Sequence, residues 1–507
     1  MKNFLFSLPE VIVETEGGAL TGSDLRTLEA VRVQQCLSLP TLCELTFADP
    51  VDALTGADRF LPGAALRVIV AGQAEPLFAG QVTAIEYSYN PGRRREIRVR
   101  GYDLLHQLRK RQEVRAHVQV NLRDLAQELV ADLGLTVQAA EPGPVWPRLI
   151  QHRQSDFDLL QESAEHCGLY LALRGTILHL LTLRGIGQAV PLVLGETLLE
   201  ARLEINADTS YRSVKAEGWN PARGEVHEGQ ASSARVGREV AAEVTPARVG
   251  GSGKRELVDE GTPDDTHAQG IAQAELDRCS AQEVTLWGVA EGDPHLQPGT
   301  PVEVTGVVET LAGRYILSSV THLIDAHKGF ISEISSVPPA RRPRVRGSVA
   351  APGIVTRIND PAKLGRICAS LPTYSNVETD WMEVLSVGAG SGKGFMAFPD
   401  VGDHVLLLFA HEDPGQGVVL GGLYGVQEPP DTGIDGGAVR RYTLLTPGGQ
   451  RIRLDDGQHT IRLENSEGSY WELSPQKVRM HSTVDLEIEA PGRRVVIRGE
   501  KIDFERG

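Results

Sequence analysis

The last 65 or so residues constrain the fold most strongly, because they repeat short strand-like segments at a spacing that one chain cannot close into a core. Segments with alternating apolar and polar residues recur about every eight residues, with Gly, Asp, Ser or Pro between them. A repeat this short supplies one strand per rung. We therefore expect this region to bury its apolar side by intertwining with further copies of itself. The segment centres are Ile452, Ile461, Trp471, Val478, Leu486, Val496 and Ile502.

Alternation along each segment predicts which side chains face inward, because neighbouring residues of a strand point to opposite faces. The predicted interior residues of this needle-like region are Ile452, Ile461, Leu463, Leu486 and Ile488. The predicted solvent-facing residues are Arg451, Arg453, Arg462, Glu464, Glu472, Arg479, Glu487 and Glu489. A shift of one residue in register would invert both sets.

The rest of the chain indicates several mainly β domains. The 507 residues are about three times the usual domain length. With 54 Gly, 29 Pro and only 5% aromatic residues, the composition favours many short strands joined by turns. The net charge of -16 would repel phosphate backbones, so we expect no nucleic-acid partner.

Local patterns predict helices inside a small α/β insertion and one more helix further on. Asn121 and Ser155 are candidate N-caps for two of these helices, and the third spans Thr266 to Gln282. The predicted domains are residues 1–114 and 190–340 as two β-barrels, 115–189 as the insertion, 341–430 as a compact β domain and 431–507 as the intertwined repeat region, with a long mobile loop at 221–264.

No residue pattern points to catalysis, a cofactor or a metal. The run Gly388 to Gly394 resembles a phosphate-binding loop, but Val387 replaces its first glycine and Gly394 its hydroxyl residue, which favours a glycine-rich loop between strands. The five cysteines are scattered and lack metal-ligand spacing. The N-terminus has no signal-peptide core and no segment is long and apolar enough to span a bilayer as a helix, so we expect synthesis in a reducing cytoplasm.

A combination of motifs at 353–425 resembles the OB-fold domain of central spike proteins of contractile injection systems, namely the VgrG family and the phage baseplate V and spike proteins. The family often has Gly where Glu412 stands and an acidic residue where His404 stands. Upstream, the chain resembles the hub of phage late-control D proteins in Gly101-Tyr102-Asp103 and Ser155-Asp156-Phe157-Asp158. The OB-domain motifs are Asn359-Asp360-Pro361, Leu364-Gly365-Arg366, Val401-Gly402-Asp403, Asp413-Pro414 and Val419-Leu420-Gly421.

The resemblance implies a homotrimer with two barrel-like hub domains per chain, an OB-fold collar and an intertwined trimeric β-helix needle. It also implies contacts with inner-tube and baseplate proteins at the hub, a PAAR-type tip protein at the needle end, and transient contact with a target envelope after assembly into a phage-tail-like particle. The implied tip-binding residues are Val496, Ile497, Ile502 and Phe504.

The expected function is therefore a structural, non-enzymatic spike that joins the inner tube to a membrane-puncturing needle. Two alternatives stay open at this point: a spike that also degrades peptidoglycan, and a type VI secretion VgrG that delivers effectors. The short linker at 425–445 leaves no room for an inserted lysozyme module, which disfavours the first alternative. A monomeric carbohydrate-binding protein is weaker still, because only five Trp are available for aromatic platforms.

Overall fold

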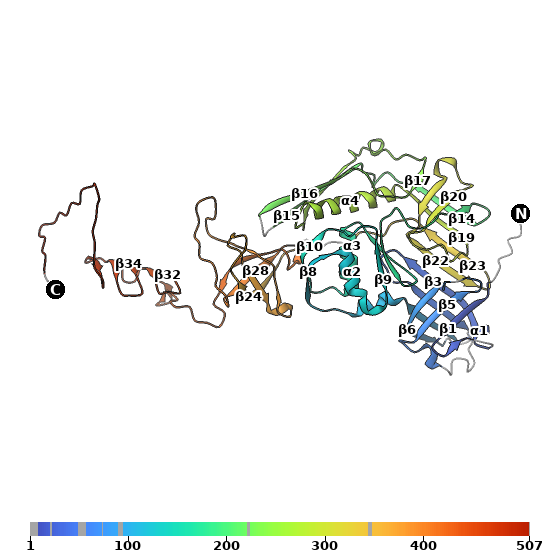
Figure 1. The fold of residues 1–507 in the computed structure, drawn as a ribbon, viewed down its shortest axis with the longest axis horizontal. Helices are drawn as coiled ribbons and strands as arrows, with labels where there is room; N and C mark the ends of the chain where they lie inside the picture. The colour runs from blue at the N-terminus through green and yellow to red at the C-terminus, as the bar shows by residue number, and fades with distance from the viewer. Residues whose placement is uncertain are drawn as a thin grey trace. The chain divides into compact units, whose positions relative to one another are not determined.

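The computed structural model contains two compact units, Met1–Leu423 and Tyr424–Gly507 (Figure 1). Strands predominate and helices are few, which confirms the predicted mainly β fold class. No helix in the described part of the chain combines the length and apolar character needed to cross a membrane. The structure describes residues 9–20, 23–48, 57–73, 75–89, 95–220, 224–342 and 347–505.

One continuous antiparallel sheet of eleven strands runs through residues 9–342, which we call the hub. Its two halves are joined where residues 319–325 pair with residues 30–36, so segments far apart in the sequence share one ladder. In spatial order the strands are β14 (Leu198–Ile205), β19 (Val284–Glu291), β23 (Gly329–Ser335), β22 (Ser319–Asp325), β3 (Leu28–Cys36), β4 (Leu42–Ala48), β7 (Glu96–Tyr102), β6 (Phe78–Ser88), β5 (Ala65–Val70), β1 (Val11–Thr15) and β2 (Gly18–Ala19).

Each half of this sheet covers its own apolar core. Val33, Phe47 and Leu66 belong to the core of the first half, and Leu286 and Val302 belong to that of the second. The short helix α1 (Ser23–Thr27) precedes β3 in the first half. A further sheet borders the second core and consists of β13 (Val190–Val193), β20 (Pro301–Thr305), β21 (Gly313–Ile316) and β17 (Glu239–Val240).

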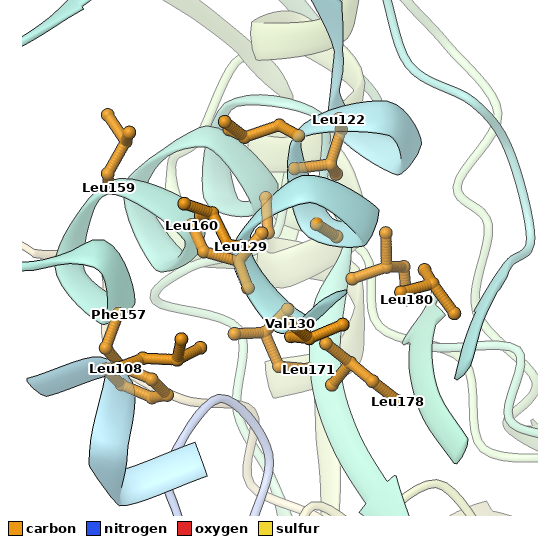
Figure 2. Packing of buried hydrophobic residues seen from close by; sticks show 14 of the residues in the cluster. Leu108, Leu122, Leu129, Val130, Phe157, Leu159, Leu160, Leu171, Leu178 and Leu180 are labelled. Atoms are coloured by element: carbon orange, nitrogen blue, oxygen red, sulfur yellow. The ribbon is translucent and has the colours of Figure 1, made fainter. Parts of the chain in front are cut away.

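The α/β insertion follows the first half of the hub sheet and has the predicted helices. The Asn121 side chain accepts a hydrogen bond from the Asp124 N–H at 2.9 Å, and Ser155 forms a capping box with Asp158. Figure 2 shows Leu129 of the first helix and Leu160 of the second packed in one apolar cluster. The elements are β8 (Arg115–Asn121), α2 (Leu122–Val130), β9 (Thr136–Ala139), β10 (Val145–Gln151), α3 (Asp156–His166), β11 (Tyr170–Arg174) and β12 (Ile177–Leu181).

The prediction of a long mobile loop at 221–264 is wrong for its described residues. Two strands of this segment flank β15 and pack with it against the third predicted helix. Among the described residues, the only apolar cluster that these two strands enter receives Ala231 from one and Leu257 from the other, and most of their polar side chains are exposed, so their apolar pattern is weak. Gly229 lies so close to this helix that a Cβ atom would come within 2.1 Å of the Gln269 backbone nitrogen. The elements are β15 (Ser213–Asn220), β16 (Glu225–Ala231), β18 (Lys254–Glu260) and α4 (Asp265–Gln282).

A six-stranded sheet at 349–423, which we call the collar, completes the first unit around a core that includes Val355, Leu407 and Phe409. In chain order its strands are β24 (Val349–Arg357), β25 (Cys368–Leu371), β26 (Val377–Glu378), β27 (Glu383–Val384), β28 (His404–Phe409) and β29 (Gly417–Leu423).

The second unit is built from short strands that pair only with their sequence neighbours. After the hairpin of β30 (Ile434–Asp435) and β31 (Ala438–Val439), five strands form one antiparallel sheet, which we call the meander. None of the buried apolar clusters includes a described residue beyond Val419. The strands of the meander are β32 (Arg441–Leu445), β33 (Arg451–Asp455), β34 (Thr460–Glu464), β35 (Tyr470–Leu473) and β36 (Val478–His481).

Candidate functional site

One face of the meander is made of apolar side chains that the chain itself leaves exposed. Directly paired residues continue across the strands, as in Ile452 opposite Leu463 and Leu463 opposite Trp471. Their exposed fractions run from 37% to 67%. We call this surface the apolar face. Its residues form two cross-strand rows, Leu444, Ile452, Leu463, Trp471 and Met480 in one and Tyr442, Leu454, Ile461, Leu473 and Val478 in the other.

The opposite face is polar and largely satisfies itself. The Arg462 guanidinium donates to Glu472 at 3.1 Å and to Glu464 at 3.0 Å, and it lies 4.0 Å from the centre of the Tyr470 ring. Only 24% of the Arg462 side chain is exposed. The meander therefore covers its charged side chains better than its apolar ones, which is the reverse of what an isolated soluble sheet requires.

An ion pair fixes the entry of the chain into the meander. Arg441 at the start of β32 donates to Asp431 at 3.0 Å, and the Thr443 hydroxyl donates to the same carboxylate at 2.9 Å. The hydrogen bond from Arg441 holds the pKa of Asp431 well below its ordinary value. This contact sets the register from which the alternation of faces continues.

The predicted interior residues fall into two groups. Ile452, Ile461 and Leu463 lie on the apolar face, and Leu486 lines a shallow groove over it together with Trp471. Ile488 is 68% exposed. The prediction left out seven further residues of this face. Strict alternation in the predicted segments would have identified Leu454, Trp471, Leu473, Val478 and Met480, whereas Tyr442 and Leu444 lie in β32, which was not among the predicted segments.

The prediction of further strands after residue 482 is wrong for the described residues. Residues 482–505 contain neither helix nor strand, so the predicted tip-binding residues lie on an extended, irregular segment. β36 is the last strand of its sheet, and a further strand requires a neighbour with which to pair. The exposed fractions of the tip-binding residues are 51% for Val496, 63% for Ile497, 47% for Ile502 and 89% for Phe504.

Hub and collar are joined by a charged strap, which consists of residues 338–342. Arg341 reaches the buried Glu260 at 3.3 Å, and Arg342 contacts Asp158 of α3 at 3.2 Å. Arg341 also lies 3.8 Å from the buried Glu275 of α4. The strap therefore ties the chain that enters the collar to β18 and to both helices.

A second set of contacts joins the collar directly to the insertion. Arg148 donates to the Glu378 carbonyl at 2.8 Å, and Arg153 forms an ion pair with Glu412 at 2.7 Å. Glu412 ends the 3-10 turn η7 (Ala410–Glu412) with a φ angle of 58°, a conformation that favours glycine. Burial raises the pKa of the neighbouring Asp413. Hub and collar are thus held together by two sets of contacts, those of the strap and those between the insertion and the collar.

The OB-domain motifs also have a structural explanation. The Asp360 carboxylate accepts hydrogen bonds from the Leu364 N–H at 2.9 Å and from the Arg366 guanidinium at 2.8 Å. The hydrogen bond from Arg366 holds the pKa of Asp360 well below its ordinary value. The described residues contain no group of three or more His, Cys, Asp or Glu arranged to hold a metal ion.

Comparison with known proteins assigns the same regions. Residues 351–424, which include nearly all of the collar, match the type VI secretion system/phage-baseplate injector OB domain. Over 90 residues the chain is 33% identical to the type VI secretion system spike protein VgrG4b of Pseudomonas aeruginosa. That match covers 17% of this chain and 10% of that protein, so the chain spans only a small part of its curated relative.

Two solved structures share the fold at low sequence identity. A chain of the half-lidded PdpA–VgrG complex of Francisella matches with a TM-score of 0.57 at 10% identity, over 94% of this chain and 89% of that one. A component of the Escherichia coli type VI secretion system, described as similar to the phage T4 tail proteins gp27 and gp5, gives a TM-score of 0.53 at 10% identity. It covers 81% of this chain and 99% of that chain.

The fold is therefore similar to that of VgrG-type spike proteins, and the collar matches an injector OB domain, as the motifs predict. Residues 42–326, from the start of β4 to just past β22, match the Alg8 N-terminal domain over more than half of the chain. The chain belongs to the family of the Alg8 N-terminal domain.

Proposed function

We propose that this chain is the structural central spike of a contractile, phage-tail-like injection system and that it acts as a homotrimer. The observation that carries the proposal is the apolar face, whose ten large side chains remain exposed in a single chain. Contiguous apolar surfaces of this kind mark association sites. The VgrG-like fold of the hub and the injector OB domain of the collar support the same assignment.

Association of three copies solves the burial problem of the meander. Three apolar faces around one axis enclose a common interior, while the polar faces with Arg462 and Glu472 stay outside. Full burial of each large apolar side chain contributes about 1.5–3 kcal/mol. Strands of other copies also supply the strand pairing that residues 482–505 do not have in one chain. The product is a stiff needle.

The remaining parts take roles along this needle. The hub binds inner-tube and baseplate proteins, the strap and collar pass axial load to the needle, and Val496, Ile497, Ile502 and Phe504 bind a PAAR-type tip protein. The chain is synthesised in the cytoplasm, assembles into the particle and contacts the target envelope as the machine contracts. Its contribution is mechanical and includes no catalytic step.

The first experiment measures the solution mass of the purified full-length chain by light scattering. The expected mass is about 165 kDa, three times the 54.9 kDa of one chain. A mass near that of one chain at micromolar concentration would contradict the proposal.

Two adjacent substitutions test which face drives association. Ile452→Asp places a carboxylate on the apolar face, where burial of an unpaired charge is strongly unfavourable, and it is expected to abolish the trimer. Arg453→Asp places the same group on the polar face opposite Arg462 and should leave the trimer intact. Equal loss of the trimer in both variants would show that the apolar and polar faces of the meander are assigned wrongly.

The absence of a catalytic step is tested separately with dye-labelled peptidoglycan. The purified chain is expected to release no more dye than buffer, whereas lysozyme releases it under the same conditions. Dye release by the chain would instead support the alternative of a spike that degrades cell wall.

A further inference from the structure

The sheet of β16, β15 and β18 packs one face on α4 and leaves the other face to solvent (Figure 1). Val214 and Ala216 of β15 are buried in one cluster with Ile271 and Leu276 of the helix. The residues between them along β15 point to the opposite side. We call this side the tryptophan face. It is formed by Ser213, Lys215, Glu217 and Trp219 of β15, Val226, Glu228 and Gln230 of β16, and Lys254, Glu256 and Val258 of β18.

The tryptophan face has an apolar centre that the chain leaves uncovered. Trp219 lies directly opposite Val226 in the antiparallel pair of β15 and β16, so their side chains are neighbours. The exposed fractions are 49% for Trp219, 63% for Val226 and 52% for Val258 on the third strand. Tryptophan is one of the residues that dominate the free energy of protein–protein binding. An exposed tryptophan on an ordered strand, beside further apolar residues, therefore indicates an interaction surface.

Next to this apolar centre, two carboxylates share one lysine. Glu217 lies directly opposite Glu228, and like charges in such a pair repel each other. The Lys215 ammonium bridges them, at 2.5 Å from Glu217 and 2.7 Å from Glu228. Glu256 lies opposite Lys215 on β18 and makes no ion pair or hydrogen bond with the described residues. The single bridging lysine therefore leaves this part of the face with a net negative charge.

The collar contributes one more carboxylate beside the tryptophan. A Cβ atom at Gly224 would lie 3.8 Å from the Glu383 Oε1 and 3.9 Å from the Trp219 ring, so both groups border the same turn. An indole ring attracts a cation over its face. Carboxylates close to the ring strengthen this attraction, because they lower the electrostatic energy of a positive charge placed there.

We propose that the tryptophan face docks a basic segment of a partner protein, with an arginine or lysine side chain over the Trp219 ring and in reach of Glu217 and Glu228. The face carries three glutamates and two lysines, and Glu383 adds to its negative charge. Charge complementarity therefore favours a basic partner over an acidic surface. The inference goes beyond the proposed spike function and does not depend on the trimer.

A fluorescein-labelled arginine oligopeptide tests the proposal by fluorescence anisotropy with the full-length chain. We expect saturable binding that weakens as salt is added, since salt screens exposed charges. The same peptide with glutamine in place of each arginine should not bind. Because the whole chain is acidic, with a net charge of -16, binding of the arginine peptide alone does not locate the site.

Three variants locate the site. Trp219→Ala is expected to weaken binding by about tenfold or more, because it removes the aromatic anchor. Glu228→Gln should also weaken binding, whereas Glu196→Gln removes an exposed carboxylate outside the tryptophan face and should leave the affinity unchanged. Circular dichroism confirms that the variants fold. Equal affinity of Trp219→Ala and wild type would overturn the proposal and would leave the proposed spike function standing.

An N-acetylglucosamine oligomer provides a competing probe, because exposed tryptophans beside carboxylates can also bind sugars. We expect no binding of this oligomer in isothermal titration calorimetry. If the oligomer bound the wild type but not Trp219→Ala, and the arginine peptide did not bind, the tryptophan face would be a carbohydrate site and the proposal would be wrong.

Discussion

Glu412 occupies a left-handed backbone conformation at the junction between hub and collar. The φ angle of 58° explains why the resembling family often has glycine at this position. Glutamate is retained here with an ion pair of 2.7 Å to Arg153, which partly offsets the strain. The sequence shows the departure from the family pattern, but only the structure gives its backbone cause and its partner.

Substitution at Glu412 can separate strain from ion pairing. Glu412→Gly and Glu412→Ala both lose the contact with Arg153, so they differ in backbone preference. We expect the Gly variant to be more stable than the Ala variant by about 1 kcal/mol, because an L-residue pays a steric penalty in the left-handed region. Urea unfolding of the collar measures the difference. Equal stability of the two variants would show that the turn relaxes.

Asp360 should make stability depend on pH in the acid range. Its folded pKa is lowered by the Arg366 hydrogen bond, so its charged form stabilises the fold above the pKa of the unfolded chain. That contribution is lost as the pH falls towards the lowered folded pKa. The unfolding free energy of Asp360→Asn should therefore fall below wild type at neutral pH and approach it in acid. If the difference in unfolding free energy between Asp360→Asn and wild type stayed constant across this pH range, the charge of Asp360 would not be the source of the stabilisation.

At the scale of elements, buried ion pairs attach segments whose apolar patterns are weak. Arg235 donates to Asp277 of α4 at 2.9 Å and to Glu141 of the insertion at 2.6 Å. Burial opposes the charge of Glu275 on the same helix, yet the hydrogen bond from Arg278 holds the pKa of Glu275 below its ordinary value. These contacts connect α4 to the segment that was predicted as a mobile loop.

Removing one partner of such a pair should be costly. Arg235→Ala leaves the carboxylate of Asp277, whose side chain is 1% exposed, without its guanidinium. We expect a loss of about 3–5 kcal/mol in the free energy of unfolding. Arg202→Ala removes the exposed pair with Glu200 and should change stability by about 0–1 kcal/mol. Similar losses in the two variants would mean that burial does not set the cost.

At the scale of the whole molecule, the two units differ in how they satisfy their apolar residues. Every buried apolar cluster among the described residues lies in the first unit, while the large apolar residues of the meander stay exposed. The first unit therefore has buried apolar cores of its own and is expected to fold alone. The meander can bury its apolar face only against further copies of the chain.

A chain that ends at Leu423 tests this division. We expect it to keep the thermal unfolding transition of the hub within a few degrees of the full-length chain, because it retains all of the buried clusters. Full-length chain measured in parallel by calorimetry is the control. A large downward shift would show that the second unit stabilises the first.

Local patterns in the sequence determined the elements that form from neighbouring residues. The caps at Asn121 and Ser155 were predictable because capping depends on side chains within three residues. The meander strands were predictable for a similar reason, since alternation and turn residues set them locally. The motif residues around Asp360 were recognisable in sequence, although their hydrogen bonds were not.

Tertiary structure alone decided what depends on distant partners. β16 and β18 form because they pair with β15 and pack on α4, not because of their own weak apolar pattern. The pairing of β3 with β22 and the docking of Arg341 on Glu260 likewise depend on residues far apart in the chain. Sequence fixes a residue's local preference, but burial and charge pairing are properties of the neighbours that folding supplies.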